Sequence, residues 1–381
     1  MKIALVSPYD FAVPGGVNNH IEHLRDNFLR LGQEVRIIAP SSRPSSHKPE
    51  DRVIPIGRAV GIPASGSVAR VTLSLRLAPK VKKALQEEHF DIVHVHEPFA
   101  PFLPLQVLRQ SNAVNVATFH AAKEGGRNRW YLWGRHALKR WFRRLDGKIA
   151  VSAPAMRLVS HYFPGYYNII PNGVDVEHFE EKREPIPQFA DGRPNILFVG
   201  RLEKRKGVKY LLQAFAEVKK ETPESRLLIV GPPTRAARGY HRWVNEAGLA
   251  DVEFIGYVTY DELARYHHTA DIVVAPATGN ESQGIVLLEA MAAGRPLVAS
   301  NIEGYASVVT HGVEGLLVTP KDRRSLAAAL VELLADSDKR REMGENGRLR
   351  AEQFRWDRVS QRVLTYYEQL QYESKAGLET E

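Results

Sequence analysis

Two glutamates, Glu281 and Glu289, are separated by seven residues around the start of an apolar helical pattern. Ser282 is placed to cap that helix, which leaves backbone N–H groups near Gly284 and Ile285 free to bind a phosphate. Glu281 lies just ahead of the helix and could accept hydrogen bonds from sugar hydroxyls. Glu289 lies about one and a half turns further on and faces either a bound polar group or solvent. This spacing therefore predicts a site for a phosphorylated sugar.

Two further segments combine glycines with positions suited to anions. Gly200–Gly207 follows an expected strand and precedes a helix, and its cations Arg201 and Lys206 are placed to bind a diphosphate. Gly15 and Gly16 open the first expected helix, where backbone N–H groups can approach an anion. A solvated basic loop and a simple tight turn are the respective alternatives.

Three other features narrow the chemistry. The first glycine loop is not the G-x-G-x-x-G of dinucleotide sites, and the second strand ends in Ala39-Pro40 without an acidic residue for a ribose, which argues against a dehydrogenase. His120, at the end of the strand Val114–Thr118, could contact a substrate, although a structural histidine is the alternative. Asp175 and Glu177 look like metal ligands, but they lie in a turn between domains, so we expect no metal site.

The elements that must position these residues follow from the hydrophobic pattern. Short apolar runs separated by amphipathic stretches are typical of parallel sheets covered by helices, and two successive series predict two doubly wound α/β domains. Ligands of such sheets bind at the carboxyl ends of the strands, where the residues above lie. The expected strands are Ile3–Ser7, Val35–Ala39, Ile92–Val95, Val114–Thr118, Lys148–Val151, Asn195–Gly200, Arg226–Val230, Val252–Ile255, Ile272–Ala275, Pro296–Ala299 and Gly315–Val318.

Domain boundaries follow from the same pattern. We place an N-terminal domain at residues 1–172 and a charged, proline-containing linker at 173–194. A second domain occupies 195–354. Residues 355–381 form a C-terminal helix followed by a frayed tail.

Composition excludes several chemistries. The 381 residues are 44% hydrophobic and 25% charged, as in globular proteins too long for one core. The absence of cysteine excludes disulfides, Fe–S clusters and thiolate nucleophiles. The sequence shows no signal peptide and no apolar run of about 20 residues, so we expect a cytoplasmic protein.

Positive charge gathers in the first half of the chain. Residues 1–190 hold 26 Lys+Arg against 17 Asp+Glu, whereas the rest holds 26 against 27. Such asymmetry favours a phosphate-bearing partner: a membrane surface, a nucleic acid or a phosphorylated substrate. The alternative is that the positive charge has no specific partner and only keeps the protein soluble.

These motifs together resemble the retaining glycosyltransferases of the GT-B fold, in the glycogen-synthase-like group (family 4 type). The resemblance covers nearly the whole chain, and the paired glutamates make it specific. Within the group the chain looks most like the bacterial phosphatidylinositol alpha-mannosyltransferases. The resemblance implies two Rossmann-like domains facing across a cleft that holds the active site, with the C-terminal helix of residues 355–381 crossing back to the first domain. The motifs that carry it are Pro14-Gly15-Gly16, Phe119-His120, Pro171–Asp175, Gly200-Arg201, Lys206-Gly207 and the Glu281/Glu289 pair, with Ser7–Val17, Gly66–Arg70, His94–Pro98 and Gly284–Gly294 for the mannosyltransferases.

The resemblance also implies site residues. His120, Arg201, Lys206 and Glu281 would be catalytic, with the two cations neutralising the departing diphosphate and His120 against the transferred sugar. Glu289 would bind the nucleotide ribose. The donor site would comprise Gly15, Gly16, Arg201, Lys206, Glu281, Gly284, Ile285, Val286 and Glu289, and the acceptor site Tyr9, Asn18, Ser65, Ser67, Arg70, His120 and Lys123.

Two departures from the family pattern concern substrate choice. Gln283 stands where an aromatic residue is common, and Ala64 and Ser65 stand where the mannosyltransferases have a tyrosine and an asparagine near the inositol acceptor. The second departure bears on inositol itself and leaves glycosyl transfer intact.

The resemblance assigns the basic half of the chain to membrane docking. The docking region would carry Arg76, Lys80, Lys82 and Lys83 on or before an amphipathic helix with Leu73, Leu75, Leu77, Val81 and Leu85. Trp130, Trp133 and Trp141 with nearby arginines also suit an anionic bilayer, although core packing and stacking on single-stranded nucleic acid are alternatives.

We therefore expect a nucleotide sugar, GDP-mannose, as donor and phosphatidylinositol or a related lipid as acceptor, at the inner face of the plasma membrane, with no nucleic-acid partner and neither metal nor cofactor required. Three rival functions remain open. They are a glycosyltransferase with a soluble or polysaccharide acceptor and a UDP-sugar donor, a sugar-nucleotide epimerase, and a nucleic-acid-binding protein.

Overall fold

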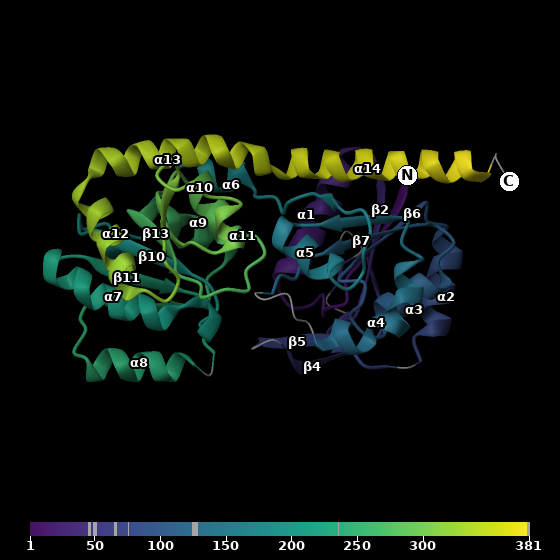
Figure 1. The fold of residues 1–381 in the computed structure, drawn as a ribbon, viewed down its shortest axis with the longest axis horizontal. Coiled ribbons are helices and arrows are strands. Elements are labelled where there is room, and N and C mark those ends of the chain that lie inside the picture. Colours follow the sequence, from purple (N-terminus) through teal and green to yellow (C-terminus); the bar gives the residue numbers. More distant parts are fainter. Residues whose placement is uncertain are drawn as a thin grey trace. The chain divides into compact units, whose positions relative to one another are not determined.

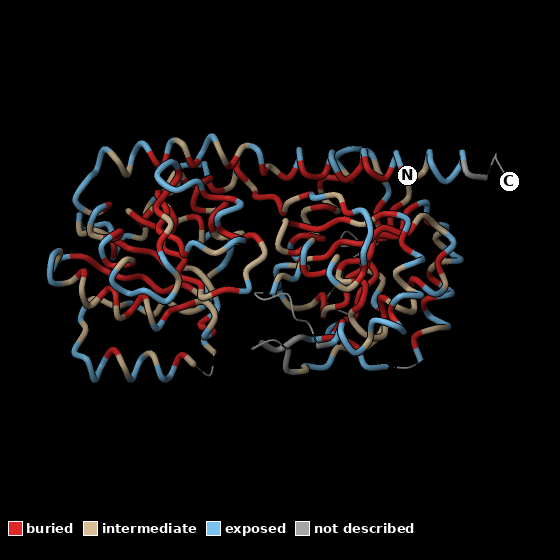
Figure 2. Tube along the Cα trace, in the orientation of Figure 1, coloured by how far each residue is buried: buried red, intermediate tan, exposed pale blue. Residues whose placement is uncertain are grey.

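The computed structural model describes residues 1–44, 47–48, 52–64, 67–74, 76–123, 129–234 and 236–378. The chain divides into two compact units. Unit 1 comprises Met1–Asn172 together with the C-terminal helix that begins at Trp356, and unit 2 comprises Gly173–Arg355. Figure 1 shows the helices and strands of each unit, and Figure 2 shows the buried segments of each, which include the central strands of both sheets.

Unit 1 contains a seven-stranded sheet in the order β3-β2-β1-β6-β7-β8-β9. Every neighbouring pair is parallel, as the apolar runs predict. The order reverses between β1 and β6, which is the position where doubly wound sheets bind ligands. The strands are β1 (Lys2–Val6), β2 (Glu34–Ala39), β3 (Val53–Pro55), β6 (Ile92–His96), β7 (Val114–Phe119), β8 (Gly147–Ala150) and β9 (Asn168–Ile169).

Helices cover both faces of this sheet because alternate strand residues point to opposite sides. Ala4 and Val6 pack with α2, α3, α4 and α5, whereas Ile3 and Leu5 pack with α1 and α14. The helix α14 thus belongs to the core of unit 1 although it lies at the other end of the chain. The bounds are α1 (Gly16–Arg30), α2 (Ala78–Glu88), α3 (Leu103–Gln110), α4 (Arg129–Phe142), α5 (Ala153–Ser160) and α14 (Trp356–Leu378).

An antiparallel hairpin, β4 (Ala59–Ala64) and β5 (Ser67–Thr72), interrupts the βα series of unit 1. We did not predict it from the sequence, because Gly61 and Pro63 are residue types depleted in strands. The hairpin reaches the end of β1: Tyr9 bridges Val71, and the Asp10 N–H donates to the Arg70 carbonyl at 2.8 Å.

Unit 2 contains a six-stranded parallel sheet in the order β12-β11-β10-β13-β14-β15, with its reversal between β10 and β13. All six predicted strands are present, with ends that differ by at most one residue. They are β10 (Asn195–Val199), β11 (Arg226–Val230), β12 (Val252–Gly256), β13 (Ile272–Ala275), β14 (Leu297–Ser300) and β15 (Gly315–Val318).

The helices of unit 2 also form two layers. One face of the sheet packs on α7, α8 and α12, and the other on α6, α9, α10 and α11. Our predicted linker contains α6 and a 3-10 turn at Pro187–Phe189, both packed into unit 2. The bounds are α6 (Val176–Glu180), α7 (Val208–Glu221), α8 (Ala237–Glu246), α9 (Tyr260–Thr269), α10 (Ile285–Ala292), α11 (Glu303–Ala306), α12 (Arg323–Ala335) and α13 (Ser337–Ala351).

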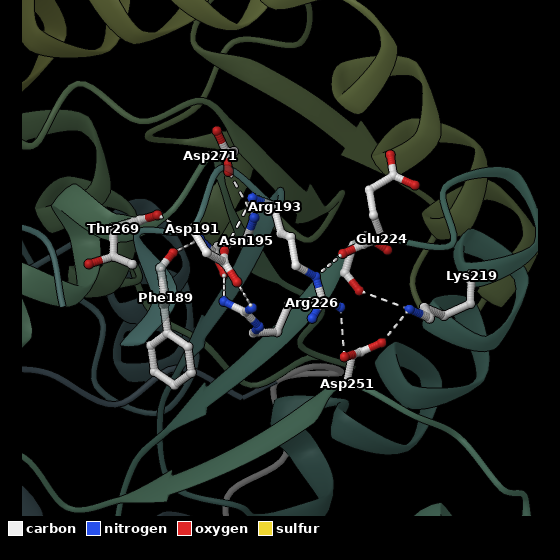
Figure 3. Close-up of polar contacts among 11 residues, drawn as sticks. Phe189, Asp191, Arg193, Asn195, Lys219, Glu224, Arg226, Asp251, Thr269 and Asp271 are labelled. Atoms are coloured by element: carbon white, nitrogen blue, oxygen red, sulfur yellow. Dashed lines mark hydrogen bonds and ion pairs between the residues drawn. The ribbon is translucent and has the colours of Figure 1, made fainter. Parts of the chain in front are cut away.

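A polar network anchors the start of β10 (Figure 3). The buried Asn195 donates its side-chain amide to the carbonyls of Phe189 and Thr269, at 2.9 and 3.3 Å. Its own N–H donates to Asp271 at 2.7 Å, and Arg226 reaches Asn195 Oδ1 at 3.3 Å. These contacts fix the amino end of the strand and so stabilise unit 2 away from the carboxyl-end loops.

Candidate active site

The carboxyl ends of β10 and β13 bring together the predicted donor residues of unit 2. The loop after β10 carries Arg201 and Lys206, and the loop after β13 carries Glu281. Lys206 Nζ lies 2.9 Å from Glu281 Oε1, and the Arg205 guanidinium binds the same oxygen. Neighbouring strands at the switch point therefore place cations and a carboxylate side by side, as a diphosphate-linked sugar requires.

A second carboxylate holds the arginines of the β10 loop. Glu203 is 7% exposed and accepts from Arg201 at 2.8 Å and from Arg205 at 3.0 Å. Arg201 keeps 46% of its side chain exposed, so it remains accessible to a ligand. Thr278 ties the β13 loop to the Arg205 carbonyl, with its N–H at 2.8 Å. The structure thus positions the cations before any ligand binds.

The helix α10 begins at Ile285, with Gly284 as its N-cap. Our expectation that Ser282 caps this helix is wrong, because Gly284 takes that position in the left-handed region, with φ of 85°. A Cβ at Gly284 would overlap the ring of the buried Tyr305. The N–H groups of Ile285 and Val286 begin the helix, as the predicted anion site requires.

Glu289 on α10 is partly buried, so it is not the solvent-exposed helix residue that was the alternative. Only 14% of its side chain is accessible, and burial raises the pKa of the carboxyl to about 7, opposed by the charge of Lys206. Nε2 of His267 on α9 lies 3.9 Å from Glu289 Oε2, and both ring nitrogens of His267 are buried with no hydrogen-bond partner in the part of the chain that the structure describes. Burial lowers the pKa of His267 to about 3, so this neighbour is neutral.

In unit 1, the loop after β1 presents Gly15 and Gly16 at the start of α1. Neither glycine has a positive φ, and a Cβ at either would meet no atom of the described residues within 4 Å. Among those residues the space beside them is open, and a turn that needs a positive φ does not explain their presence. Asn18 is buried and holds the loop: it accepts from Ser7 Oγ at 2.7 Å and donates to the Asp10 carbonyl at 2.8 Å.

His120 follows β7 and belongs to a group of histidines. Nε2 of His120 lies 3.0 Å from Nδ1 of His96 at the end of β6. The His20 ring on α1 contacts the His120 ring edge-on, with 4.9 Å between the ring centroids. Burial lowers the pKa of the His120 imidazole well below 6.5. The backbone N–H of His120 donates to Glu97 Oε1 at 2.7 Å. The His94 ring packs against the His96 ring at a tilt, and Nδ1 of His94 is hydrogen-bonded to the buried hydroxyl of Tyr367 from α14.

The other predicted acceptor residues are only partly described. Tyr9 is half-buried, and burial raises the pKa of its hydroxyl. Arg70 is exposed on β5, and Lys123 is exposed three residues after His120. Ser65 lies outside the described residues, and of Ser67 only the backbone is described. Asp175, considered as a metal ligand, instead caps α6 by accepting from the His178 N–H at 3.1 Å.

The predicted docking residues Arg76, Lys80, Lys82 and Lys83 are all exposed. The helix α2 that carries the lysines starts at Ala78, so Leu73 lies outside it and is 44% exposed.

The tryptophans of α4 do not share one environment. Trp130 and Trp133 are 51% and 76% exposed, whereas Trp141 is partly buried against the core that includes Tyr131 and Leu138. Among the described residues, no helix is long and apolar enough to cross a membrane.

Sequence reasoning missed several residues of these sites. Arg205 lies in the basic run but was not selected, and Glu203 pairs with it only in the folded loop. His96 could have been found, because His94 and His96 alternate on one strand and so share a face. Nothing local in the sequence marks His267 or His20, since their neighbours come from other elements.

The folds of the two units and the cation–carboxylate site define a GT-B glycosyltransferase, a hexosyltransferase. Residues 14–178 match the model of Glycosyltransferase Family 4, and residues 179–350 that of Glycosyl transferases group 1. Among solved structures, sucrose-phosphate synthase from Thermosynechococcus elongatus matches with a TM-score of 0.77 and 25% identity, covering 97% of this chain and 98% of that one.

The comparison with curated proteins is more specific. Phosphatidyl-myo-inositol mannosyltransferases of Mycobacterium leprae and Mycolicibacterium smegmatis are 37% and 36% identical to the chain, over 97% and 100% of its length and 96% of theirs. The chain belongs to the family of these mannosyltransferases. A glycogen synthase of Mycobacterium tuberculosis is also related, at 29% identity over 96% of this chain and 94% of the relative.

Proposed function

We propose that this protein transfers mannose from GDP-mannose to phosphatidylinositol or a closely related lipid, with retention of the anomeric configuration. The identity of 35–37% with mannosyltransferases over nearly the full length carries this proposal. The geometry supports the donor half of it. Glu281, held by Lys206 and Arg205, would accept hydrogen bonds from the sugar hydroxyls, and Glu289 would bind the ribose.

The same residues can stabilise the transition state. The departing nucleoside diphosphate gains negative charge, and fixed cations with the α10 N–H groups lower the free energy of that charge. When the diphosphate binds Lys206 and Arg205, the Glu281 carboxylate is released toward the sugar. No carboxylate nucleophile stands among the proposed residues, so front-face displacement assisted by the leaving diphosphate is the proposed route, without a metal ion.

The acceptor half of the proposal rests on unit 1. The exposed cations Arg76, Lys80, Lys82 and Lys83 suit the anionic headgroups of the inner membrane face, to which the protein would bind peripherally. The exposed Arg70, whose backbone carbonyl accepts from the Asp10 N–H beside Tyr9, would bind the phosphate of a lipid headgroup.

A soluble or polysaccharide acceptor with a UDP-sugar donor is the second candidate, favoured by the related glycogen synthase. A panel of GDP- and UDP-sugars tests both. Nucleotide release from GDP-mannose that rises with phosphatidylinositol vesicles, and not with phosphatidylcholine vesicles, supports the proposal. Turnover of a UDP-sugar that is indifferent to lipid favours the alternative.

A further inference from the structure

Three histidines of unit 1 bring their ring nitrogens together at the carboxyl ends of neighbouring strands. One nitrogen from each of His20, His96 and His120 lies within 4.8 Å of the other two. Nδ1 of His96 and Nε2 of His120 are 3.0 Å apart. Two imidazole nitrogens that bind one tetrahedral Zn²⁺ at about 2.0–2.1 Å are about 3.3 Å from each other. The His96–His120 pair therefore already has close to the spacing of two ligands.

A hydrogen bond to one ring nitrogen fixes the orientation of His20, as is common for histidines that bind metals. Its Nδ1 lies 2.9 Å from Oδ1 of Asn172. An amide oxygen only accepts, so Nδ1 carries the proton and Nε2 offers its lone pair. Histidines that bind metals commonly donate their second nitrogen to an oxygen in this way.

His96 is not satisfied by the protein alone. The residue is fully buried, and its Nε2, the nitrogen that does not face His120, has no hydrogen-bond partner among the described residues. Without a metal, the 3.0 Å contact between Nδ1 of His96 and Nε2 of His120 is a hydrogen bond with one proton between the two nitrogens. A metal ion would displace that proton, and the partnerless Nε2 of His96 can carry it after a change of tautomer.

We propose that His20, His96 and His120 form a site for one divalent transition-metal ion of the zinc type, and that its occupancy inhibits transfer. Three imidazoles favour Zn²⁺, Ni²⁺ or Cu²⁺ over Mg²⁺ or Ca²⁺, which prefer oxygen ligands. Inhibition rests on the proposed function, because a metal ion would hold His120 away from the donor sugar. Binding of the ion does not rest on it.

The test measures metal binding without substrate, on the full chain free of any tag. Competition of Zn²⁺ with a chromophoric chelator should show one site per chain, and Co²⁺ should give the visible absorption of a tetrahedral nitrogen site. His96→Gln and His20→Gln should each weaken Zn²⁺ binding at least tenfold, by analogy with the loss from removing supporting groups. The exposed His161 of the same unit provides the control, and His161→Gln should bind as the wild type does.

Two variants guard against misfolding, and each is checked by its circular dichroism and thermal unfolding. Zn²⁺ affinity that is unchanged in both folded variants would overturn the proposal, as would a wild type that binds Mg²⁺ as tightly as Zn²⁺. Zn²⁺ should also reduce transfer by the wild type, with recovery on adding EDTA. If the protein binds one Zn²⁺ but transfers no sugar, the metal site stands and the proposed function fails.

Discussion

Lys206 Nζ and Glu281 Oε1 lie 2.9 Å apart, although 74 residues separate them between the loops after β10 and β13. The carboxylate holds the lysine at the proposed diphosphate position, and the lysine holds the carboxylate at the proposed position of the sugar. Each group therefore positions the other before the donor arrives.

Replacing Glu281 by Gln should lower kcat/KM about 100-fold, the size expected when one group of a preorganised charged site is lost. The amide cannot hold Lys206 and Arg205 as an ion pair does. Steady-state kinetics with GDP-mannose measures the effect. Glu253→Gln, an exposed change on β12 of the same unit, is the matched control and should leave kcat/KM unchanged. Wild-type rates for Glu281→Gln would remove this residue from the site.

Glu289 should make stability depend on pH. Its folded-state pKa of about 7 lies above the ordinary 4.5, because burial disfavours the charged carboxylate. Below the unfolded-state pKa, Glu289 is neutral in both the folded and the unfolded protein, and the folded protein keeps its full stability. That stability is lost as the pH rises through about 7. Between pH 5 and 8, the wild type should lose up to about 3 kcal/mol relative to Glu289→Gln in its free energy of unfolding. Parallel pH dependences in denaturant unfolding would contradict this.

The extent of sequence-based prediction differs between the sheets and the sites. The central strands were predicted because parallel strands, buried on both faces, are continuous apolar runs such as Arg226–Val230. The rule that ligands bind at the carboxyl ends of the strands put Lys206 and Glu281 at the same edge of the sheet, but the contact between them was not predicted. The hairpin of β4 and β5 and the pairing of Glu203 with Arg205 depend on contacts outside any local period, so the sequence did not predict them.

Tyr367 should matter more than its neighbour Tyr366. The Tyr367 hydroxyl is buried against Nδ1 of His94, at 2.5 Å, and His94 packs on His96 beside His120. Tyr367→Phe should lower the free energy of unfolding by about 1–2 kcal/mol, because a buried nitrogen loses its partner, and should also lower kcat. The Tyr366 hydroxyl accepts only a 3.2 Å bond from the Lys148 N–H, so Tyr366→Phe should cost less. Equal effects on kcat would argue against this link between α14 and the histidines.

Gly207, at the end of the basic loop after β10, lies close to the backbone of the loop after β13. Its φ is 77°, and a Cβ would overlap the Pro276 carbonyl. Gly207→Ala should raise the KM for the donor at least tenfold by moving the cations. Gly192→Ala provides the control, since Gly192 also has a positive φ, of 83°, but meets no atom within 4 Å. It should cost about 1 kcal/mol of stability and leave the KM unchanged. Identical KM values for both variants would show that the close approach is unimportant.

Mass spectrometry of the intact lipid tests the central claim most directly. The protein is incubated with GDP-mannose and phosphatidylinositol vesicles, and the lipid mass is followed with time. We predict a gain of one hexose with the wild type and almost none with Glu281→Gln. An unchanged lipid, with hexose appearing instead on a soluble sugar, would contradict the account.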